Sequence, residues 1–101
     1  MFQELNENNF EAETSSGLKL VDFYADWCGY CTKQQEVLDE LSQKDFWIGK
    51  LNCDNNESVA RKYGVSALPT MILFKNGKVA AQITGYHTKS QLLDKLMPHI
   101  S

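Results

Sequence analysis

The chain has little of what marks several large classes of protein. Its longest apolar runs fall well short of the roughly 20 residues that a membrane-spanning helix needs. Lysine and arginine form no cluster, and the formal net charge is −3, so nothing indicates a nucleic-acid partner. The first ten residues contain two acids, no base and no apolar segment, which disfavours an export signal. We therefore expect a cytoplasmic protein without a membrane anchor.

Cysteine is also scarce, and its spacing is informative. The three cysteines are Cys28, Cys31 and Cys53. A disulfide between the first two would close a very short loop and remove little entropy from the unfolded chain, so stability explains the pair poorly. An odd number of cysteines with one close pair is typical of a reducing compartment and of one working redox pair.

The pattern of apolar residues predicts an α/β fold. The chain has 101 residues, and we expect residues 1–101 to form one compact domain. Strands are predicted at residues 2–5, 18–25, 46–51, 70–74 and 79–83, and helices at 6–14, from Cys31 to about Lys44, at 57–63 and after Thr88. This alternation predicts one sheet with helices on both faces.

Local signals predict where several elements begin and end. Asn6 is a candidate N-cap for the first helix. Asn76 and Gly77 lie between two apolar runs and predict a hairpin, because both central turn residues need a positive φ. Thr88 with Gln91 has the spacing of a capping box at the start of the last helix.

The close cysteine pair follows a buried strand and opens a helix. The unpaired N–H groups and the dipole at a helix N-terminus stabilise a thiolate, which lowers the pKa of a cysteine from its usual value of about 8.5. No acid lies between Cys28 and Glu36, and Lys33 adds a favourable charge. We therefore predict that Cys28 is an accessible nucleophile and that Cys31, on the inward face of the helix, is the resolving thiol.

Asp22 interrupts the buried strand six residues before Cys28. A carboxylate in such a strand loses hydration, so its pKa should rise unless a cation or hydrogen-bond donors compensate. One interpretation is a structural acid that its neighbours satisfy. The other is a group that takes and returns the Cys31 proton, with Lys50 as its electrostatic neighbour.

A cysteine pair of this spacing is also half of a zinc site. Structural zinc takes four ligands, usually from a second pair. Only Cys53, His87 and His99 remain, and they are not paired in sequence, so we expect no metal. Cys53 follows a strand parallel to the one before Cys28, which places it at the same edge of the sheet. It is either a small buried apolar residue or a third thiol open to glutathionylation or to an intermolecular disulfide.

Residues 21–31 (VDFYADWCGYC) resemble the active-site strand and loop of thioredoxins. Further matches in the same order are residues 50–52 (KLN), 63–65 (YGV), 68–70 (LPT) and 74–77 (FKNG), so the resemblance covers essentially the whole chain. It implies the thioredoxin fold, a central mixed sheet of five strands in the order 1-3-2-4-5 flanked by four helices. It also implies protein-disulfide reductase activity, with Asp22 and Lys50 as a buried acid and its cationic partner.

The resemblance further implies a cis bond between Leu68 and Pro69 and a docking groove beside the cysteines. In this family an extended substrate segment pairs with the backbone just before that proline, as an added strand would. The implied groove residues are Trp27, Gly29, Tyr30, Ala67, Leu68, Pro69, Gly85 and Tyr86. Without the resemblance, Trp27 and Tyr86 would be interpreted as ordinary half-buried aromatic residues.

The family also suggests partners. No cofactor is expected to be bound, and the electrons would come from NADPH through a thioredoxin reductase. Ribonucleotide reductase, peroxiredoxins and methionine sulfoxide reductases are the implied substrate classes, and we expect a monomer. A non-catalytic binding module on the same fold is a competing interpretation, which the intact Cys28 and Cys31 pair and Asp22 disfavour.

The sequence departs from the usual thioredoxin pattern at two positions. Tyr30 replaces the proline between the cysteines, and the Gly29 and Tyr30 pair resembles that of bacterial periplasmic disulfide isomerases. Tyr30 restores a backbone N–H near the sulfurs, which should favour the thiolate and make the pair more oxidising. A disulfide isomerase or oxidase is therefore the alternative, whereas Leu68 favours a reductase. Glu36 replaces a helix proline, which predicts a straighter helix.

Overall fold

The computed structural model describes residues 2–44 and 46–100. Its elements are β1 (Phe2–Leu5), α1 (Phe10–Thr14), β2 (Leu18–Tyr24), α2 (Gly29–Ser42), β3 (Ile48–Asn52), α3 (Glu57–Lys62), β4 (Thr70–Lys75), β5 (Lys78–Thr84) and α4 (Lys89–Leu96), followed by a 3-10 turn, Met97–His99. The predicted order of strands and helices is confirmed. No helix in the described ranges is long and apolar enough to cross a membrane.

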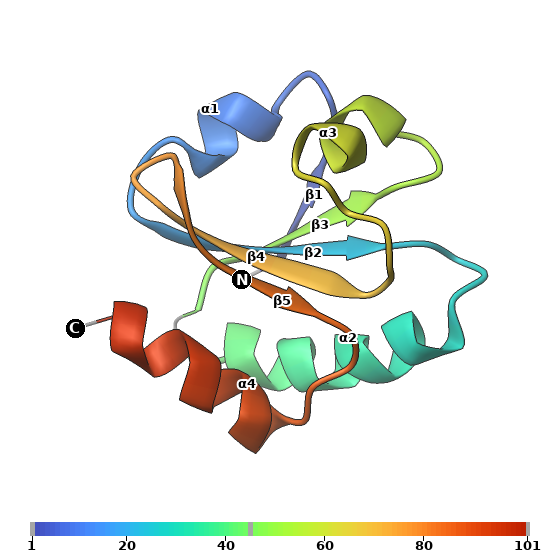
Figure 1. Cartoon of the computed structure of the whole chain (residues 1–101). Helices are drawn as coiled ribbons and strands as arrows, with labels where there is room; N and C mark the ends of the chain where they lie inside the picture. The colour runs from blue at the N-terminus through green and yellow to red at the C-terminus, as the bar shows by residue number, and fades with distance from the viewer. Residues whose placement is uncertain (1, 45, 101) are drawn as a thin grey trace.

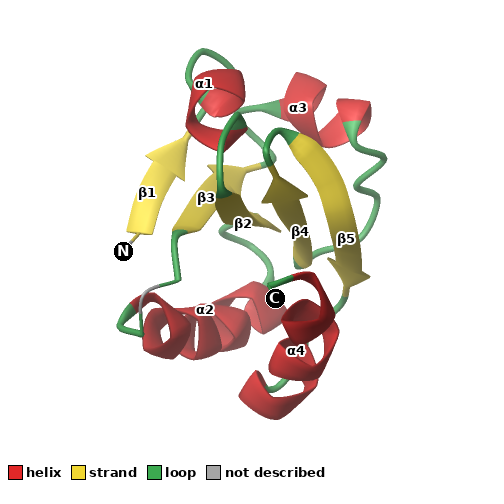
Figure 2. Cartoon of the chain, turned by 90° about the vertical axis from the view of Figure 1, so that its left-hand side faces the viewer, coloured by secondary structure: helices red, strands yellow, loops and turns green. Residues whose placement is uncertain are grey.

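The five strands form one mixed sheet in the order β1-β3-β2-β4-β5. The strands β1, β3 and β2 are parallel, whereas β4 runs antiparallel to β2 and β5 antiparallel to β4. Helices α1 and α3 cover one face of the sheet, and α2 and α4 cover the other (Figures 1 and 2). The strand order and the layers that the resemblance implied are therefore both present.

Two apolar clusters fill the spaces between the sheet and its helices. Successive strand residues point to opposite faces. Val21 and Phe23 of β2 accordingly pack with Phe10 of α1, while Leu20 packs with Leu38 of α2. Asp22 has the same parity as Leu20 and therefore points toward the face that α2 covers.

The strand directions bring four connections to one edge of the sheet, which we call the carboxyl edge. Strands β2 and β3 end there, and the Cys53 N–H donates to the Tyr24 carbonyl at 2.8 Å. Thr70 at the start of β4 pairs with both Phe23 and Thr84, so the segment before Thr70 and the segment after Thr84 reach the same edge. The two cysteine segments, the proline loop and residues 85–87 therefore converge there.

The structure corrects one helix boundary and confirms two turn signals. Helix α1 begins at Phe10 with Asn9 as its N-cap, so the prediction of Asn6 as the cap is wrong. The Asn6 side-chain oxygen instead accepts the N–H groups of Asn8 and Asn9, which makes a turn before the helix. The hairpin has the predicted positive φ at Asn76 and Gly77, and α4 opens with the predicted capping box.

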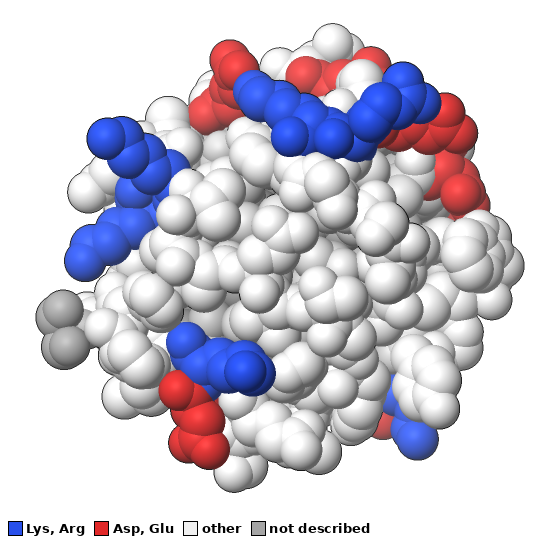
Figure 3. Space-filling view, viewed as in Figure 1, with Lys and Arg blue, Asp and Glu red and all other residues white. Residues whose placement is uncertain are grey.

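Charged side chains are spread over the surface in separate groups. On the face seen in Figure 3, lysine and arginine lie at several places along the margin, and some adjoin acidic side chains. The centre of that face carries neither sign of charge. Basic residues therefore form no continuous area on that face.

Candidate redox site

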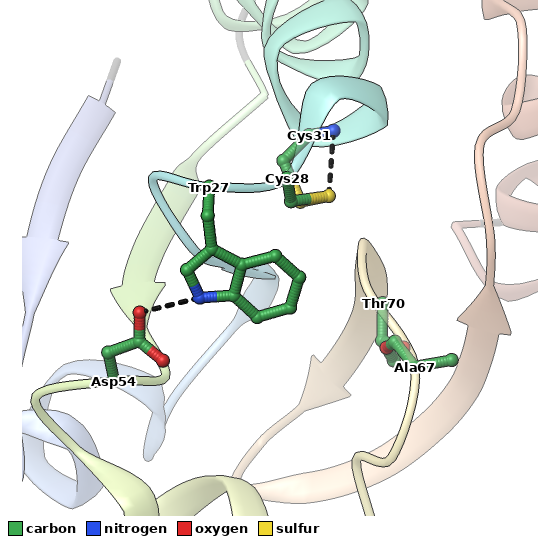
Figure 4. Close-up of a disulfide and its surroundings, with 6 residues drawn as sticks. All are labelled: Trp27, Cys28, Cys31, Asp54, Ala67 and Thr70. Atoms are coloured by element: carbon green, nitrogen blue, oxygen red, sulfur yellow. Dashed lines mark hydrogen bonds between the residues drawn. A yellow bond between two sulfur atoms is a disulfide. The ribbon is translucent and has the colours of Figure 1, made fainter.

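Cys28 and Cys31 form a disulfide with 5.3 Å between their Cα atoms. Cys28 is the N-cap of α2, and its sulfur accepts the Cys31 backbone N–H at 3.2 Å (Figure 4). The first turn of α2 contains no acidic residue. Because the unpaired N–H groups of a helix lie at its N-terminus, this position stabilises negative charge on the Cys28 sulfur.

The two sulfur-bearing residues differ less in exposure than the sequence predicted. Cys31 is 5% exposed, as expected for an inward-facing residue, but Cys28 is only 8% exposed. The prediction of a freely accessible Cys28 is therefore wrong for the oxidised state. Only a small part of the Cys28 residue faces solvent in this disulfide-bonded state.

Asp22 is fully buried, and neither of its carboxyl oxygens has a hydrogen-bond partner among the described residues. Burial raises its pKa from 3.8 to about 7, while the positive charge of Lys50 lowers it and the negative charge of Glu4 raises it. Desolvation therefore outweighs the attraction of the cation. The interpretation of Asp22 as a structural acid satisfied by its neighbours does not hold.

Lys50 is the β3 residue in register with Asp22. Its ammonium lies 5.0 Å from the centroid of the Tyr24 ring and 5.8 Å from that of Phe2, so aromatic faces hold it. A cavity of about 310 Å³ opens beside it, lined by Tyr24, Ala25, Asp26, Cys31, Thr32, Gln35, Glu36 and Lys50. Cys31 and Lys50 thus border one space.

The loop before β4 faces the disulfide. The Leu68-Pro69 bond is cis, as the resemblance implied. The Thr70 hydroxyl donates to the Ala67 carbonyl at 2.6 Å, and the Gly85 N–H donates to the Pro69 carbonyl at 2.8 Å. Ala67 and Thr70 lie across from Cys28 and Cys31 in Figure 4. These bonds fix the loop on the side of the disulfide away from α2.

Exposed aromatic side chains flank the disulfide. Trp27 is 72% exposed and Tyr30 is 63% exposed, so Trp27 is not an ordinary half-buried aromatic residue. The Trp27 indole N–H donates to an Asp54 carboxyl oxygen at 2.8 Å (Figure 4), and the Tyr30 ring lies 6.4 Å from the half-buried Tyr86 ring. Large apolar side chains held in the open are typical of contact surfaces.

Comparison with known proteins identifies the family. A family model described as Thioredoxin matches residues 1–97. The chain is 38% identical to the thioredoxin of Chlamydia caviae and 39% identical to that of Chlamydia pneumoniae, each over 98% of this chain and 99% of the relative. It is 38% identical to the thioredoxin of Bacillus subtilis over 93% of both chains. The chain belongs to the thioredoxin family.

Membership of the thioredoxin family gives the disulfide its chemistry. The protein is a thioredoxin-type thiol-disulfide oxidoreductase with protein-disulfide reductase activity, and Cys28 and Cys31 are its redox-active pair. The protein functions in electron transport and in cell redox homeostasis. Within residues 2–44 and 46–100, no three His, Cys, Asp or Glu side chains group as metal ligands.

Cys53 lies at the carboxyl edge, as the strand directions predicted. It is half-buried, and burial raises its pKa to about 11, with the negative charges of Asp22 and Asp54 raising it further. It lines a second cavity, of about 470 Å³, with Trp27, Asp54, Glu57, Ala60, Arg61, Val65, Ser66, Ala67 and Leu68. A thiol in these surroundings stays protonated at neutral pH, which favours the interpretation of a small apolar residue.

Two polar residues of the site did not stand out in the sequence. Asp54 lies in the short connection between β3 and α3, and nothing in the local sequence connects it to Trp27. Gln34 occupies a buried position on α2 with Cys31, Leu38 and Leu41. A polar residue in an apolar stripe indicates a buried hydrogen bond, but the sequence does not show which residue is the partner.

Proposed function

We propose that this protein reduces disulfides of other proteins with Cys28 as the nucleophile and Cys31 as the resolving thiol. The Cys28 thiolate attacks a substrate disulfide, forms a mixed disulfide and releases one substrate thiolate. Cys31, deprotonated, then attacks the Cys28 sulfur, closes the Cys28–Cys31 disulfide and releases the second substrate thiolate. The observation that carries this assignment is the position of Cys28 as the N-cap of α2, with the Cys31 N–H bonded to its sulfur.

The proposed role of Asp22 is to take the proton from Cys31 during the second attack. A group with a pKa of about 7 exchanges protons readily near neutral pH. Its burial, its unpartnered oxygens and its direction toward α2 support this role. Lys50 would hold the carboxylate once it is charged, and the cavity beside Cys31 and Lys50 gives water a route to the proton.

The proposed docking groove lies between the disulfide and the proline loop. Its residues are Trp27, Gly29, Tyr30, Ala67, Leu68, Pro69, Gly85 and Tyr86. The exposed Trp27 and Tyr30 beside the disulfide and the proline loop across from it support this surface (Figure 4). An extended substrate segment would bind there by backbone hydrogen bonds to the residue before Pro69.

The proposed electron source is NADPH, by way of a thioredoxin reductase. Proteins of the ribonucleotide reductase, peroxiredoxin and methionine sulfoxide reductase classes would receive the electrons. We place the protein in the cytoplasm as a monomer. The names of the relatives and the odd number of cysteines support these assignments.

Reduction of insulin disulfides by dithiothreitol tests the proposal, with wild type compared against Cys28→Ser and Cys31→Ser. Loss of the nucleophile should lower the rate at least about 1,000-fold. Loss of the resolving thiol should leave the first attack intact. Cys31→Ser that is reduced beforehand, freed of dithiothreitol and mixed with insulin should therefore accumulate a mixed disulfide that mass spectrometry detects. A trapped intermediate with Cys28→Ser instead would reverse the two roles.

The exposed Tyr30 between the cysteines favours a second candidate function, disulfide isomerase or oxidase activity. Its N–H belongs to the first turn of α2, where no carbonyl of the helix is available to it. An oxidase would hold its reduced pair more stably and oxidise dithiols of an unfolded substrate. Refolding of reduced ribonuclease in a glutathione buffer distinguishes the two, because a reductase gives no gain in native enzyme.

A further inference from the structure

Gln34 uses both groups of its side-chain amide on the backbone of one distant residue. Its Nε2 donates to the His87 carbonyl at 3.0 Å, and its Oε1 accepts the His87 N–H at 2.8 Å. The side chain is fully buried. A buried amide is costly without partners, so this pairing is what makes a polar residue acceptable inside the apolar stripe of α2.

Residues 85–87 are also bonded to the proline loop. The Gly85 N–H donates to the Pro69 carbonyl at 2.8 Å, and the His87 Nδ1–H donates to the Gly85 carbonyl at 2.9 Å. The segment connects β5 with α4 and passes beside α2 (Figure 1). It is therefore held at one end by the redox helix and at the other by the loop that faces the disulfide.

Two further residues of α2 contact this segment. Tyr30, Lys33 and Gln34 have the spacing that puts side chains on one face of a helix. The Tyr30 ring lies 6.4 Å from the Tyr86 ring, and the Lys33 ammonium lies 5.7 Å from its centroid. Tyr30 and Lys33 are exposed, so their contacts are weak and adaptable. Gln34 is the buried member, with directional bonds that fix the distance between α2 and the segment.

We propose that Gln34 is a positioning residue for substrate binding. It holds residues 85–87 against α2, and thereby sets the place of Tyr86 and of the Pro69 loop relative to the disulfide. The inference rests on the proposed docking groove. Gln34 contacts neither sulfur nor substrate, so its loss affects the binding of a protein segment and leaves the chemistry of the thiols unchanged.

The variant Gln34→Met tests this, because it keeps the size of the side chain and removes the donor and the acceptor. We expect the KM for insulin to rise about tenfold. We expect kcat for insulin, and kcat/KM for the small disulfide 5,5′-dithiobis(2-nitrobenzoate), to stay within about two-fold of wild type. A small disulfide needs no groove, so it reports the thiol chemistry alone.

Two controls separate positioning from stability. Gln43→Met makes the same change at the exposed C-cap of α2 and should leave both substrates unaffected. Leu41→Val weakens the core below α2 without touching residues 85–87, so it should lower stability with no selective rise in KM. Should Gln34→Met fail to fold, Gln34→Leu replaces it, because it too removes the donor and the acceptor and buries no unpartnered amide.

Hydrogen exchange at the His87 amide supplies an independent readout. That N–H should exchange faster in Gln34→Met than in wild type, because its acceptor is gone. Faster exchange with an unchanged KM for insulin would make the bond purely structural and overturn the proposal. The proposal would also be overturned if Gln34→Met lost activity equally on insulin and on the small disulfide, or if Leu41→Val raised the KM for insulin selectively.

Tyr86→Ala separates this inference from the proposed groove. If Tyr86→Ala raises the KM for insulin and Gln34→Met does not, the groove stands and the role of Gln34 is wrong. If neither variant changes the KM, residues 85–87 are not part of the groove and both fail. Cys28→Ser, inactive on both substrates, tests the thiol chemistry separately.

Discussion

Cys28 and Cys53 each follow a strand that ends at the carboxyl edge of the sheet, yet their surroundings differ. Cys28 caps a helix of 14 residues whose first turn carries no acid, and a backbone N–H donates to its sulfur. Cys53 directly follows Asn52, the last β3 residue in register with β2, and lies in a turn where burial, and then the negative charges of Asp22 and Asp54, raise the pKa of its thiol. Placement at this edge is thus not sufficient for redox chemistry. The two thiols differ because a helix N-terminus favours the thiolate of Cys28, whereas burial and two acidic neighbours disfavour that of Cys53.

Asp22 affects both the active cysteine pair and Cys53. It points toward the face of the sheet that α2 covers, and its negative charge also raises the pKa of Cys53. Burial keeps its carboxyl protonated up to about pH 7. One buried acid therefore serves the active pair in the proposed mechanism and, when charged, disfavours the thiolate of Cys53. Three measurements test the difference between these two thiol sites.

The largest expected effect is on stability, from Asp22→Asn. The native state holds the Asp22 proton up to about pH 7, whereas the unfolded chain releases it near 3.8. The free energy of unfolding of the oxidised wild type should therefore fall as the pH rises from 3.8 to about 7, and level off above. The full change in the free energy of unfolding is about 4 kcal/mol, because each unit of difference between the two pKa values is worth about 1.4 kcal/mol.

Urea unfolding of the oxidised proteins at pH 4 and pH 8 measures this difference. Asp22→Asn should match wild type near pH 4 and exceed its stability by up to about 4 kcal/mol at pH 8. The exposed Asp54→Asn is the matched control; because it keeps Asp22, its stability should fall with pH as that of wild type does. If Asp22→Asn raised the free energy of unfolding equally at both pH values, ionisation of Asp22 would not be the cause of the destabilisation.

A smaller effect is expected in the rates at which Cys28 and Cys53 are alkylated. In the reduced protein at pH 7, iodoacetamide should alkylate Cys28 at least about 100 times faster than Cys53, because the thiolate is the reacting form. Peptide mass spectrometry after timed quenching gives both rates. Comparable rates, or glutathionylation of Cys53 under mild oxidation, would remove the distinction and favour a regulatory role for Cys53.

The smallest expected effect is on the reduction potential, from substitution of Tyr30, which lies between Cys28 and Cys31 and not near Cys53 in the sequence. Tyr30→Pro removes an unpaired N–H from the first turn of α2, so the reduced pair should be less well stabilised. We expect its reduction potential to fall by about 30 mV, a tenfold change in the equilibrium constant. A glutathione redox titration measures it, with Tyr30→Phe as an unchanged control. A wild type as reducing as Tyr30→Pro, or more so, would contradict this.

Much of the fold follows from short-range signals in the sequence. The order of strands and helices along the chain, the hairpin at Asn76 and Gly77 and the capping box at Thr88 were expected, because apolar runs and turn residues act over a few positions. The spatial order of the strands was expected from the resemblance alone. The start of α1 was wrong for a local reason. Asn6 and Asn9 are equally good caps by residue type, and the structure uses the Asn6 side chain in the turn before the helix.

The reacting groups could be identified without the structure: two cysteines lie at a strand-to-helix junction, no acid follows in the first turn, and the resemblance extends along the whole chain. The tertiary structure decided their surroundings. The pKa of Asp22 depends on the burial that α2 and the sheet impose, and the partner of Gln34 lies 53 positions away. Desolvation and long-range hydrogen bonds exist only when distant segments pack, so no local pattern of residues specifies them.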